Sequence, residues 1–197
     1  MNYDNEMMKI IESLDYKPTL LLHSCCGPCS TAVIERLLDF FDITIIYYNP
    51  NIEPLEEYEK RKQEQIKVIE KLKVKYIDCD YENEKFKIIS KGLENEKEGG
   101  KRCHKCYFLR LEYVAKKASV NNYDYFSTTL TVSPYKHADV LNKIGLNLEK
   151  IYNVKYLVND FKKRNGYKRS IELSKEYDLY RQDYCGCLFS KRDDDYE

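Results

Sequence analysis

Seven of the eight cysteines in this chain are grouped in three short segments. Three lie in HSCCGPCS near the start, two in KRCHKC near the middle and two in YCGC near the end. The spacing Cys-x-x-Cys occurs at Cys26/Cys29 and again at Cys103/Cys106. At the start of a helix this spacing points two sulfur atoms toward one centre, where thiolates bind a metal. The two pairs therefore predict a metal centre.

Two such pairs supply four sulfur ligands, which suit either a structural zinc or a [4Fe-4S] cluster, and spacing alone does not distinguish them. Three more cysteines remain. Because neighbouring residues project side chains in divergent directions, Cys25 and Cys26 are expected to serve two adjacent centres. Cys25 could then join Cys185 and Cys187, with a carboxylate such as Asp80 or Asp183, around a second metal that leaves room for a substrate.

The eighth cysteine, Cys79, stands alone at the end of a predicted strand and is interpreted as a small apolar core residue. A single Cys-x-x-Cys pair would also suit a thioredoxin-like dithiol. Two pairs, an adjacent doublet and a CGC sequence together favour a metal centre over that alternative.

Charge and hydropathy limit the classes of partner. Lysine plus arginine total 33, as do aspartate plus glutamate, so the net charge is zero and an RNA partner would need a local basic patch. The first ten residues lack the basic start and apolar run of a signal peptide. No apolar run approaches the roughly 20 residues that cross a bilayer. We expect a cytoplasmic protein with no membrane span, in a compartment that keeps most thiols reduced.

Apolar runs alternate with segments of helical periodicity along the chain. Strands are predicted at 19–24, 43–49, 74–79, 125–130 and 155–158, and helices at 30–41, 55–72, 82–93, 103–120, 136–150 and 170–177. This alternation favours a Rossmann-like α/β fold, with a parallel sheet and helices on both faces, as a single domain over 1–197. Ligands of such sheets bind beyond the carboxyl ends of the strands, and the first cysteine segment follows the first strand.

Polar residues near the cysteines are candidates to bind substrate. Thr128 and Thr129, with the sequence SPYK at 133–136, offer hydroxyls and a lysine for a phosphate or ribose, although β-propensity and a turn would explain the same residues. His23 suits either an acid beside the cysteines or a satisfied core histidine. Basic clusters are typical of solvated faces, but those flanking the cysteine segments could contact phosphates. The basic clusters lie at 60–62, 101–102, 162–164 and 168–169, and the last three flank the cysteine segments.

Five sequence blocks resemble, in the same order, those of the QueH-type epoxyqueuosine reductases. They are HSCCGPCS, YYNPNIEPLEEYEKR, GGKRCHKCYFLRLE, YFSTTLTVSPYKH and LYRQDYCGCLFS, and they cover most of 20–190. The resemblance implies an α/β core similar to the nucleotide-hydrolase and PP-loop (HUP) group, with cysteines in place of the glycine-rich phosphate loop. It also implies reduction of the epoxide of epoxyqueuosine, at the wobble position of tRNA, to queuosine, the last step of queuosine synthesis.

Members of that family carry a [4Fe-4S] cluster beside a further, mononuclear iron, which agrees with the surplus of cysteines. The partition is our own inference from the spacing: we assign Cys26, Cys29, Cys103 and Cys106 to the cluster, and Cys25, Cys185 and Cys187 to the iron. The expected substrate-binding residues are Thr128, Thr129, Ser133, Tyr135, Lys136, Tyr180 and Arg181. The expected proton donors are Tyr184, His23 and Asp183. The implied partners are the tRNA anticodon loop that bears epoxyqueuosine and an external electron donor.

Two other functions would use part of this pattern. A zinc-binding RNA module without redox catalysis needs only two Cys-x-x-Cys pairs, and would leave Cys25, Cys185 and Cys187 without a role. A tRNA-thiolating enzyme of the PP-loop type would need a loop rich in glycine and serine after the first strand, and HSCCGPCS holds one glycine. Epoxide reduction accounts for more of the cysteines than either alternative.

Overall fold

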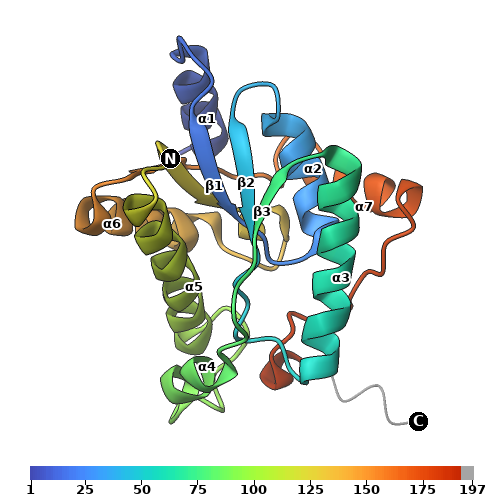
Figure 1. Ribbon diagram of the computed structural model, residues 1–197. Coiled ribbons are helices and arrows are strands. Elements are labelled where there is room, and N and C mark those ends of the chain that lie inside the picture. Colours follow the sequence, from blue (N-terminus) through green and yellow to red (C-terminus); the bar gives the residue numbers. More distant parts are fainter. Residues whose placement is uncertain (192–197) are drawn as a thin grey trace.

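A five-stranded, fully parallel sheet lies at the centre of the molecule in the computed structural model, which describes residues 1–191 (Figure 1). The strands are β1 (Thr19–His23), β2 (Asp42–Ile46), β3 (Lys75–Ile77), β4 (Tyr125–Thr128) and β5 (Lys155–Tyr156). Their order across the sheet is β3-β2-β1-β4-β5. All five predicted strands are present, each shorter than its apolar run, and the predicted α/β fold is confirmed.

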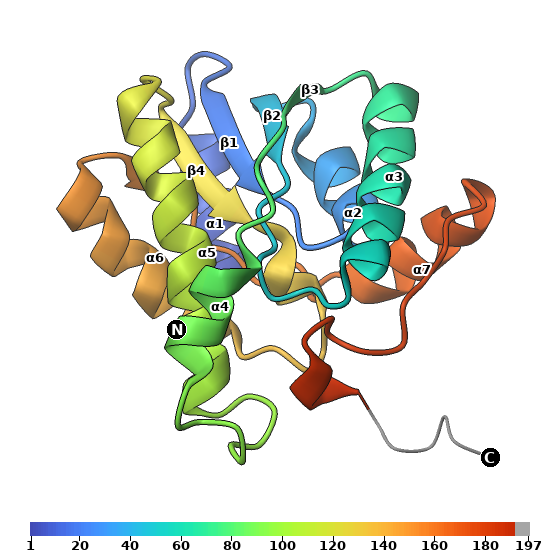
Figure 2. The same ribbon diagram turned by 60° about the horizontal axis from the view of Figure 1, so that its bottom comes forward.

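Seven α-helices surround the sheet within the described residues. They are α1 (Tyr3–Glu12), α2 (Gly27–Leu37), α3 (Leu55–Leu72), α4 (Asn83–Ser90), α5 (Lys101–Val120), α6 (Ala138–Tyr152) and α7 (Gly166–Glu176), with short 3-10 turns at Thr129–Val132 and Leu188–Ser190. Helices α5 and α6 cover one face of the sheet, and α2 and α3 cover the other, with α7 packed on α2 (Figures 1 and 2). Helix α1 was not predicted from the sequence.

The two faces of the sheet bury separate apolar cores. In β1, Leu21 faces the core under α5 and α6, whereas Leu20 and Leu22 face the core under α2 and α3. Side chains of a strand alternate between faces, so a continuous apolar run is what a strand buried on both sides requires. Helix α1 closes the second core with Met7 and Ile11, which are buried.

The connections of the chain diverge at β1. From β1 the chain crosses to β2 and β3 on one side, and it then returns to β4 on the other side of β1. The last residues of these two strands, His23 and Thr128, are paired in register. Parallel sheets bind ligands beyond the carboxyl ends of the strands at such a point. The first cysteine, Cys25, lies two residues after His23.

Beyond α7 the chain returns under the carboxyl ends of the strands, and its last described turn lies between α3 and α4 (Figure 2). This path brings the last cysteine segment toward the first one. No helix within residues 1–191 combines the length and the apolar character that crossing a membrane requires.

Candidate metal centre

Three thiols from the first cysteine segment lie together at the start of α2. The sulfur atoms of Cys25, Cys26 and Cys29 are all within 4.8 Å of one another, and within residues 1–191 no other group of three or more metal-binding side chains is as compact. Cys25 and Cys26 do not diverge as expected, because their sulfur atoms are 3.9 Å apart. Two sulfurs bound tetrahedrally to one metal, with bonds of about 2.3 Å, lie about 3.8 Å apart. This donor set therefore fits a metal.

Local backbone structure holds these three thiols. Cys26 is the N-cap residue of α2, with an extended backbone, and Cys29 lies in the first turn of that helix. The backbone N–H of Cys25 donates to Thr129 Oγ1 at 3.2 Å, and the Thr129 hydroxyl lies 3.4 Å from the sulfur of Cys25. A side chain at Gly27 would meet the backbone of α3, since its Cβ would lie 2.7 Å from the carbonyl oxygen of Glu64. Glycine therefore lets α2 begin against α3.

The other four clustered cysteines form a second neighbourhood. Cys103 and Cys106 lie in the first two turns of α5, and Cys185 lines the same cavity as Arg110 of that helix. Cys187 packs against Cys106 in a small buried cluster. Burial raises the pKa of Cys106 to about 12. A bound cation would reverse that effect, because a coordinating thiol is deprotonated by its metal.

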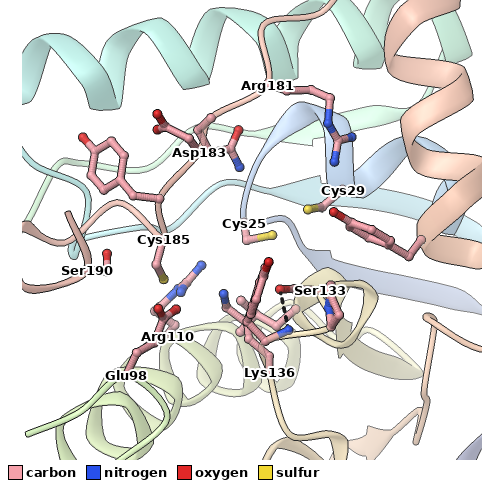
Figure 3. Close-up of a pocket in the computed structure, with 16 residues that line it drawn as sticks. Cys25, Cys29, Glu98, Arg110, Ser133, Lys136, Arg181, Asp183, Cys185 and Ser190 are labelled. Carbon is pink, nitrogen blue, oxygen red and sulfur yellow. Dashed lines mark hydrogen bonds between the residues drawn. The ribbon is translucent and has the colours of Figure 1, made fainter. Parts of the chain in front are cut away.

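One cavity joins the first and last cysteine segments. A cavity of about 170 Å³ is lined by Cys25, Cys29 and Cys185, with Arg110 and Lys136 on the side of α5 and α6 (Figure 3). Its volume is small, but it lies at the carboxyl ends of β1 and β4, where the fold places ligands. All eight cysteines are free thiols, so they are available to a metal.

Two cations offset the negative charge of the thiols. Hydrogen bonds from Cys26 and Cys29 hold the pKa of Cys25 well below its ordinary value, and the nearby charges of Arg110 and Lys136 lower it further. Arg110 is only 2% exposed. A thiolate is the form of cysteine that binds metal, so this arrangement prepares Cys25 as a ligand.

His23 is not placed to give a proton to a substrate in this cavity. Its side chain is fully buried and does not line the cavity. Nδ1 lies 2.9 Å from Thr128 Oγ1, and Nε2 lies 3.0 Å from the carbonyl oxygen of Tyr48. Burial lowers the pKa of His23 to about 3. His23 is therefore a neutral, hydrogen-bonded core histidine beneath the cysteines, the second of the two roles expected for it.

The other expected proton donors do line the cavity. The hydroxyl of Tyr184 donates to the carbonyl oxygen of Glu53 at 2.9 Å, so its proton is already engaged. Asp183 is exposed at the same wall. No hydrogen bond or ion pair to Asp183 occurs within the described chain.

The expected substrate-binding residues divide into two groups. Four of them line the cavity, namely Ser133, Tyr135, Lys136 and Arg181. The other three do not. Thr128 and Thr129 are buried beside His23 and Cys25, and Tyr180 contacts α3 through Glu57 and Glu64.

Sequence reasoning did not foresee that three arginines, Arg61, Arg102 and Arg110, are buried. Arg110 follows Cys103 by seven residues and Cys106 by four, so helical spacing alone places all three on one face of α5. Arg61 belongs to a basic cluster that we interpreted as a solvated face, yet it is 1% exposed. That interpretation is wrong for Arg61 and, in the cluster at 101–102, for Arg102, which is 2% exposed. Cys79 is 8% exposed and outside both cysteine groups, in agreement with its interpretation as a core residue.

Sequence comparisons match the chain to one family. A family model described as "Epoxyqueuosine reductase QueH" matches residues 20–193. A curated protein of that name from Staphylococcus epidermidis is 46% identical over 201 residues, which cover 96% of this chain and 84% of the relative. Another of the same name, from Thermotoga maritima, is 38% identical over 175 residues, covering 87% of this chain and 90% of the relative.

Solved structures share the fold at low sequence identity. The U34-tRNA thiolase NcsA from Methanococcus maripaludis, described with its [4Fe-4S] cluster, aligns with a TM-score of 0.58 and 13% identity, over 96% of this chain and 67% of that one. NMN synthetase from Francisella tularensis aligns with a TM-score of 0.55 and 12% identity, over 98% of this chain and 79% of that one. These similarities show a common α/β architecture.

Proposed function

This chain belongs to the epoxyqueuosine reductase QueH family, and we infer from this that it is an oxidoreductase that converts epoxyqueuosine in tRNA to queuosine. The reaction breaks both carbon–oxygen bonds of the epoxide and leaves a carbon–carbon double bond. Two electrons and two protons enter, and the oxygen leaves as water. The observation that carries the proposal is the cavity at the carboxyl ends of β1 and β4, which is lined by thiols of the first and the last cysteine segment.

We propose that the cysteines form two neighbouring metal sites. Four thiols, the number that a [4Fe-4S] cluster takes, come from Cys103, Cys106, Cys185 and Cys187. Three come from Cys25, Cys26 and Cys29 and would leave a position open on a single iron, as in catalytic metal sites with three protein ligands. When bound, these groups supply single electrons and Lewis acidity.

This division differs from the one expected from the sequence. That expectation separated Cys25 from Cys26, and the 3.9 Å between their sulfur atoms favours keeping them together. The packing of Cys187 against Cys106, and the presence of Cys185 with Arg110 of α5 in one cavity lining, favour the second set.

The remaining residues of the cavity would bind and orient the modified base. Tyr135 is 65% exposed beside the cavity and offers an aromatic face on which a base flipped out of the anticodon loop could stack. Lys136 and Arg181 offer positive charge for the sugar-phosphate backbone. Asp183, which has no other partner in the described chain, is the candidate for proton transfer to the departing oxygen.

The electrons would come from an external one-electron donor, and the reaction would take place in the cytoplasm. The test is to incubate anaerobically reconstituted protein and a chemical reductant with tRNA that bears epoxyqueuosine. Mass spectrometry of the digested tRNA should show loss of one oxygen atom from the modified nucleoside. Unchanged epoxyqueuosine with protein of full iron content would contradict the proposed function, whereas a colourless protein that binds only zinc would support the RNA-module alternative.

A further inference from the structure

Arg61 on α3 is a buried cation outside the cavity lining. Its Nε donates to Glu57 Oε1 at 2.6 Å, and its Nη1 donates to the carbonyl oxygen of Cys185 at 3.2 Å. Its Nη2 has no hydrogen-bond partner among the described residues. Burying a guanidinium costs free energy of folding unless the group is well paired. The pairing of Arg61 with the last cysteine segment therefore suggests a role there.

The turn formed by Cys185, Gly186 and Cys187 fits closely against α3 and the loop before it. Gly186 has a backbone φ of +120°, which other residues rarely adopt. A Cβ atom there would lie 2.9 Å from Ile52 Cγ1 and 3.0 Å from Arg61 Nη1. The carbonyl oxygen of Gly186 accepts a hydrogen bond from the backbone N–H of Glu53 at 2.9 Å. The turn is therefore bound through its backbone, and no larger residue fits at its centre.

The residue before this turn is bound at the same place. The guanidinium carbon of Arg61 lies 4.8 Å from the ring centroid of Tyr184, a cation–π contact. The hydroxyl of Tyr184 donates to the carbonyl oxygen of Glu53 at 2.9 Å. Arg61 thus contacts the segment at two successive residues, Tyr184 and Cys185.

We call the segment 180–187 the C-terminal strap, and one face of α3 binds it at Tyr180, Tyr184 and Cys185. Arg181, between them, donates to Ser170 and Ser174 of α7 instead. The backbone N–H of Tyr180 donates to Glu64 Oε2 at 2.9 Å, and its hydroxyl donates to Glu57 Oε1 at 3.3 Å. Lys60 Nζ lies 3.4 Å from the ring centroid of Tyr180. Glu57, Lys60, Arg61 and Glu64 are three or four residues apart, so they share one side of the helix.

The far end of the strap contacts the opposite half of the molecule. Cys187 packs against Cys106 of α5 and Phe86 of α4. Farther along, the guanidinium carbon of Arg102 lies 4.5 Å from the ring centroid of Phe189. The strap therefore joins α3 to α5, and its position sets where Cys185 and Cys187 lie relative to Cys106.

We propose that Arg61 is a positioning residue that fixes the C-terminal strap, so that the thiols of Cys185 and Cys187 meet those of α5. The inference rests on the proposed function for its statement that these two cysteines are metal ligands. Arg61 acts through the carbonyl oxygen of Cys185 and the ring of Tyr184, and it does not contact the substrate cavity.

The test measures thiol accessibility in the metal-free, fully reduced full-length protein, where no metal can hold the strap. Cys187 is 6% exposed and should be protected from alkylation in the wild-type protein. In Arg61→Met its alkylation rate, followed by mass spectrometry, should rise about tenfold, the scale of one lost hydrogen bond to a charged group. Arg61→Lys keeps the charge and should restore part of the protection.

Arg36→Met is the matched control, because Arg36 of α2 is also paired with a carboxylate, at 2.6 Å from Asp4, and its hydrogen bonds go to Asp4 and Met8 of α1. It should leave the alkylation rate of Cys187 unchanged. Gly186→Ala disturbs the same contact from the side of the strap, because its added methyl group would crowd Arg61. It should raise the alkylation rate of Cys187 as Arg61→Met does. The proposal is overturned if Cys187 is as well protected in both Arg61→Met and Gly186→Ala as in the wild-type protein. It is also overturned if the alkylation rate of Cys187 rises as much in the Arg36→Met control as in Arg61→Met.

The same proteins separate this inference from the proposed function. Suppose that the wild-type protein reduces no epoxyqueuosine, while Cys187 becomes reactive in Arg61→Met and stays protected in Arg36→Met. In that case the proposed function fails and the positioning role of Arg61 stands. If the wild-type protein is active and Arg61→Met keeps both its Cys187 protection and its iron content, the positioning role fails and the function stands.

Discussion

Arg110 donates a hydrogen bond from Nη2 to the side-chain carbonyl oxygen of Asn49, and this pair links α5 to the loop that follows β2. The other end of the Asn49 amide donates to the carbonyl oxygen of Ser24 at 2.9 Å, next to Cys25. Arg110 is also close enough to Cys106 to oppose the rise in its pKa that burial causes. A single buried cation thus serves both sets of thiols.

Replacing this cation should weaken metal binding at both sets. Arg110→Met removes the positive charge that favours the thiolates, and we expect metal affinity to fall by about 10- to 100-fold, the range typical of groups that support metal ligands. Loss of iron during a timed challenge with a chelator measures the effect. Arg110→Lys keeps the charge and should lose less iron. Chelator resistance equal to that of the wild type in Arg110→Met would contradict this role.

Single serine variants should separate the two cysteine sets. Cys103→Ser should abolish the broad visible absorbance of the reconstituted cluster together with turnover. Cys25→Ser should keep that absorbance, lose part of the iron and reduce turnover by at least about a hundredfold, because a direct ligand matters more than a supporting residue. Absorbance, iron content and activity are measured on the same preparations. Loss of absorbance in both variants would mean that the thiols of the two sets share one centre.

The sheet could be predicted from the sequence because each strand is an apolar run bounded by breakers. Helix α1 was missed because its ten residues carry four charged side chains, and its apolar positions Met7 and Ile11 supply only a short stripe. Its N-cap, Asn2, which accepts from the N–H of Asn5 at 3.3 Å, was the available signal. Tertiary contacts with the core under α2, more than local propensity, stabilise such a helix.

The meeting of distant cysteine segments followed from the rule that parallel sheets gather ligands at one edge. The grouping of individual sulfurs did not, because it depends on the backbone angles of Cys26, whose φ of −172° and ψ of 160° precede the first turn of α2. The burial of Arg61 was equally inaccessible, since it depends on a strap more than a hundred residues away in sequence. Sequence spacing predicts which residues share an element. It does not predict which side chains a distant segment of the chain will bury.

Cys79 offers a prediction about pH that is independent of the metal sites. Burial raises its pKa to about 11 from an ordinary value of 9.0, so the neutral thiol should persist to higher pH in the folded protein than in the unfolded chain. At pH 8 the thiolate fraction should be about a hundredfold smaller than in the unfolded chain, because each pKa unit is a factor of ten. The alkylation rate of Cys79 against pH, with and without denaturant, measures both midpoints. A midpoint near 9 in the folded protein would contradict the prediction.

Tyr135 should contribute to binding of the modified base more than to the chemical step. Its ring is 65% exposed at the cavity that Cys25, Cys29 and Cys185 line, and stacking of one base on an aromatic ring is worth about 1–3 kcal/mol. Tyr135→Ala should therefore raise KM for tRNA by about 5- to 150-fold with little change in kcat. Tyr135→Phe, which keeps the ring, should remain close to the wild type.

Tyr16 is 59% exposed and precedes β1, at the amino ends of the strands and away from the cavity. Tyr16→Ala is therefore the control for loss of an exposed tyrosine. Equal KM values for Tyr135→Ala and Tyr16→Ala would place the base elsewhere, and a fall in kcat alone would instead assign Tyr135 to the chemical step.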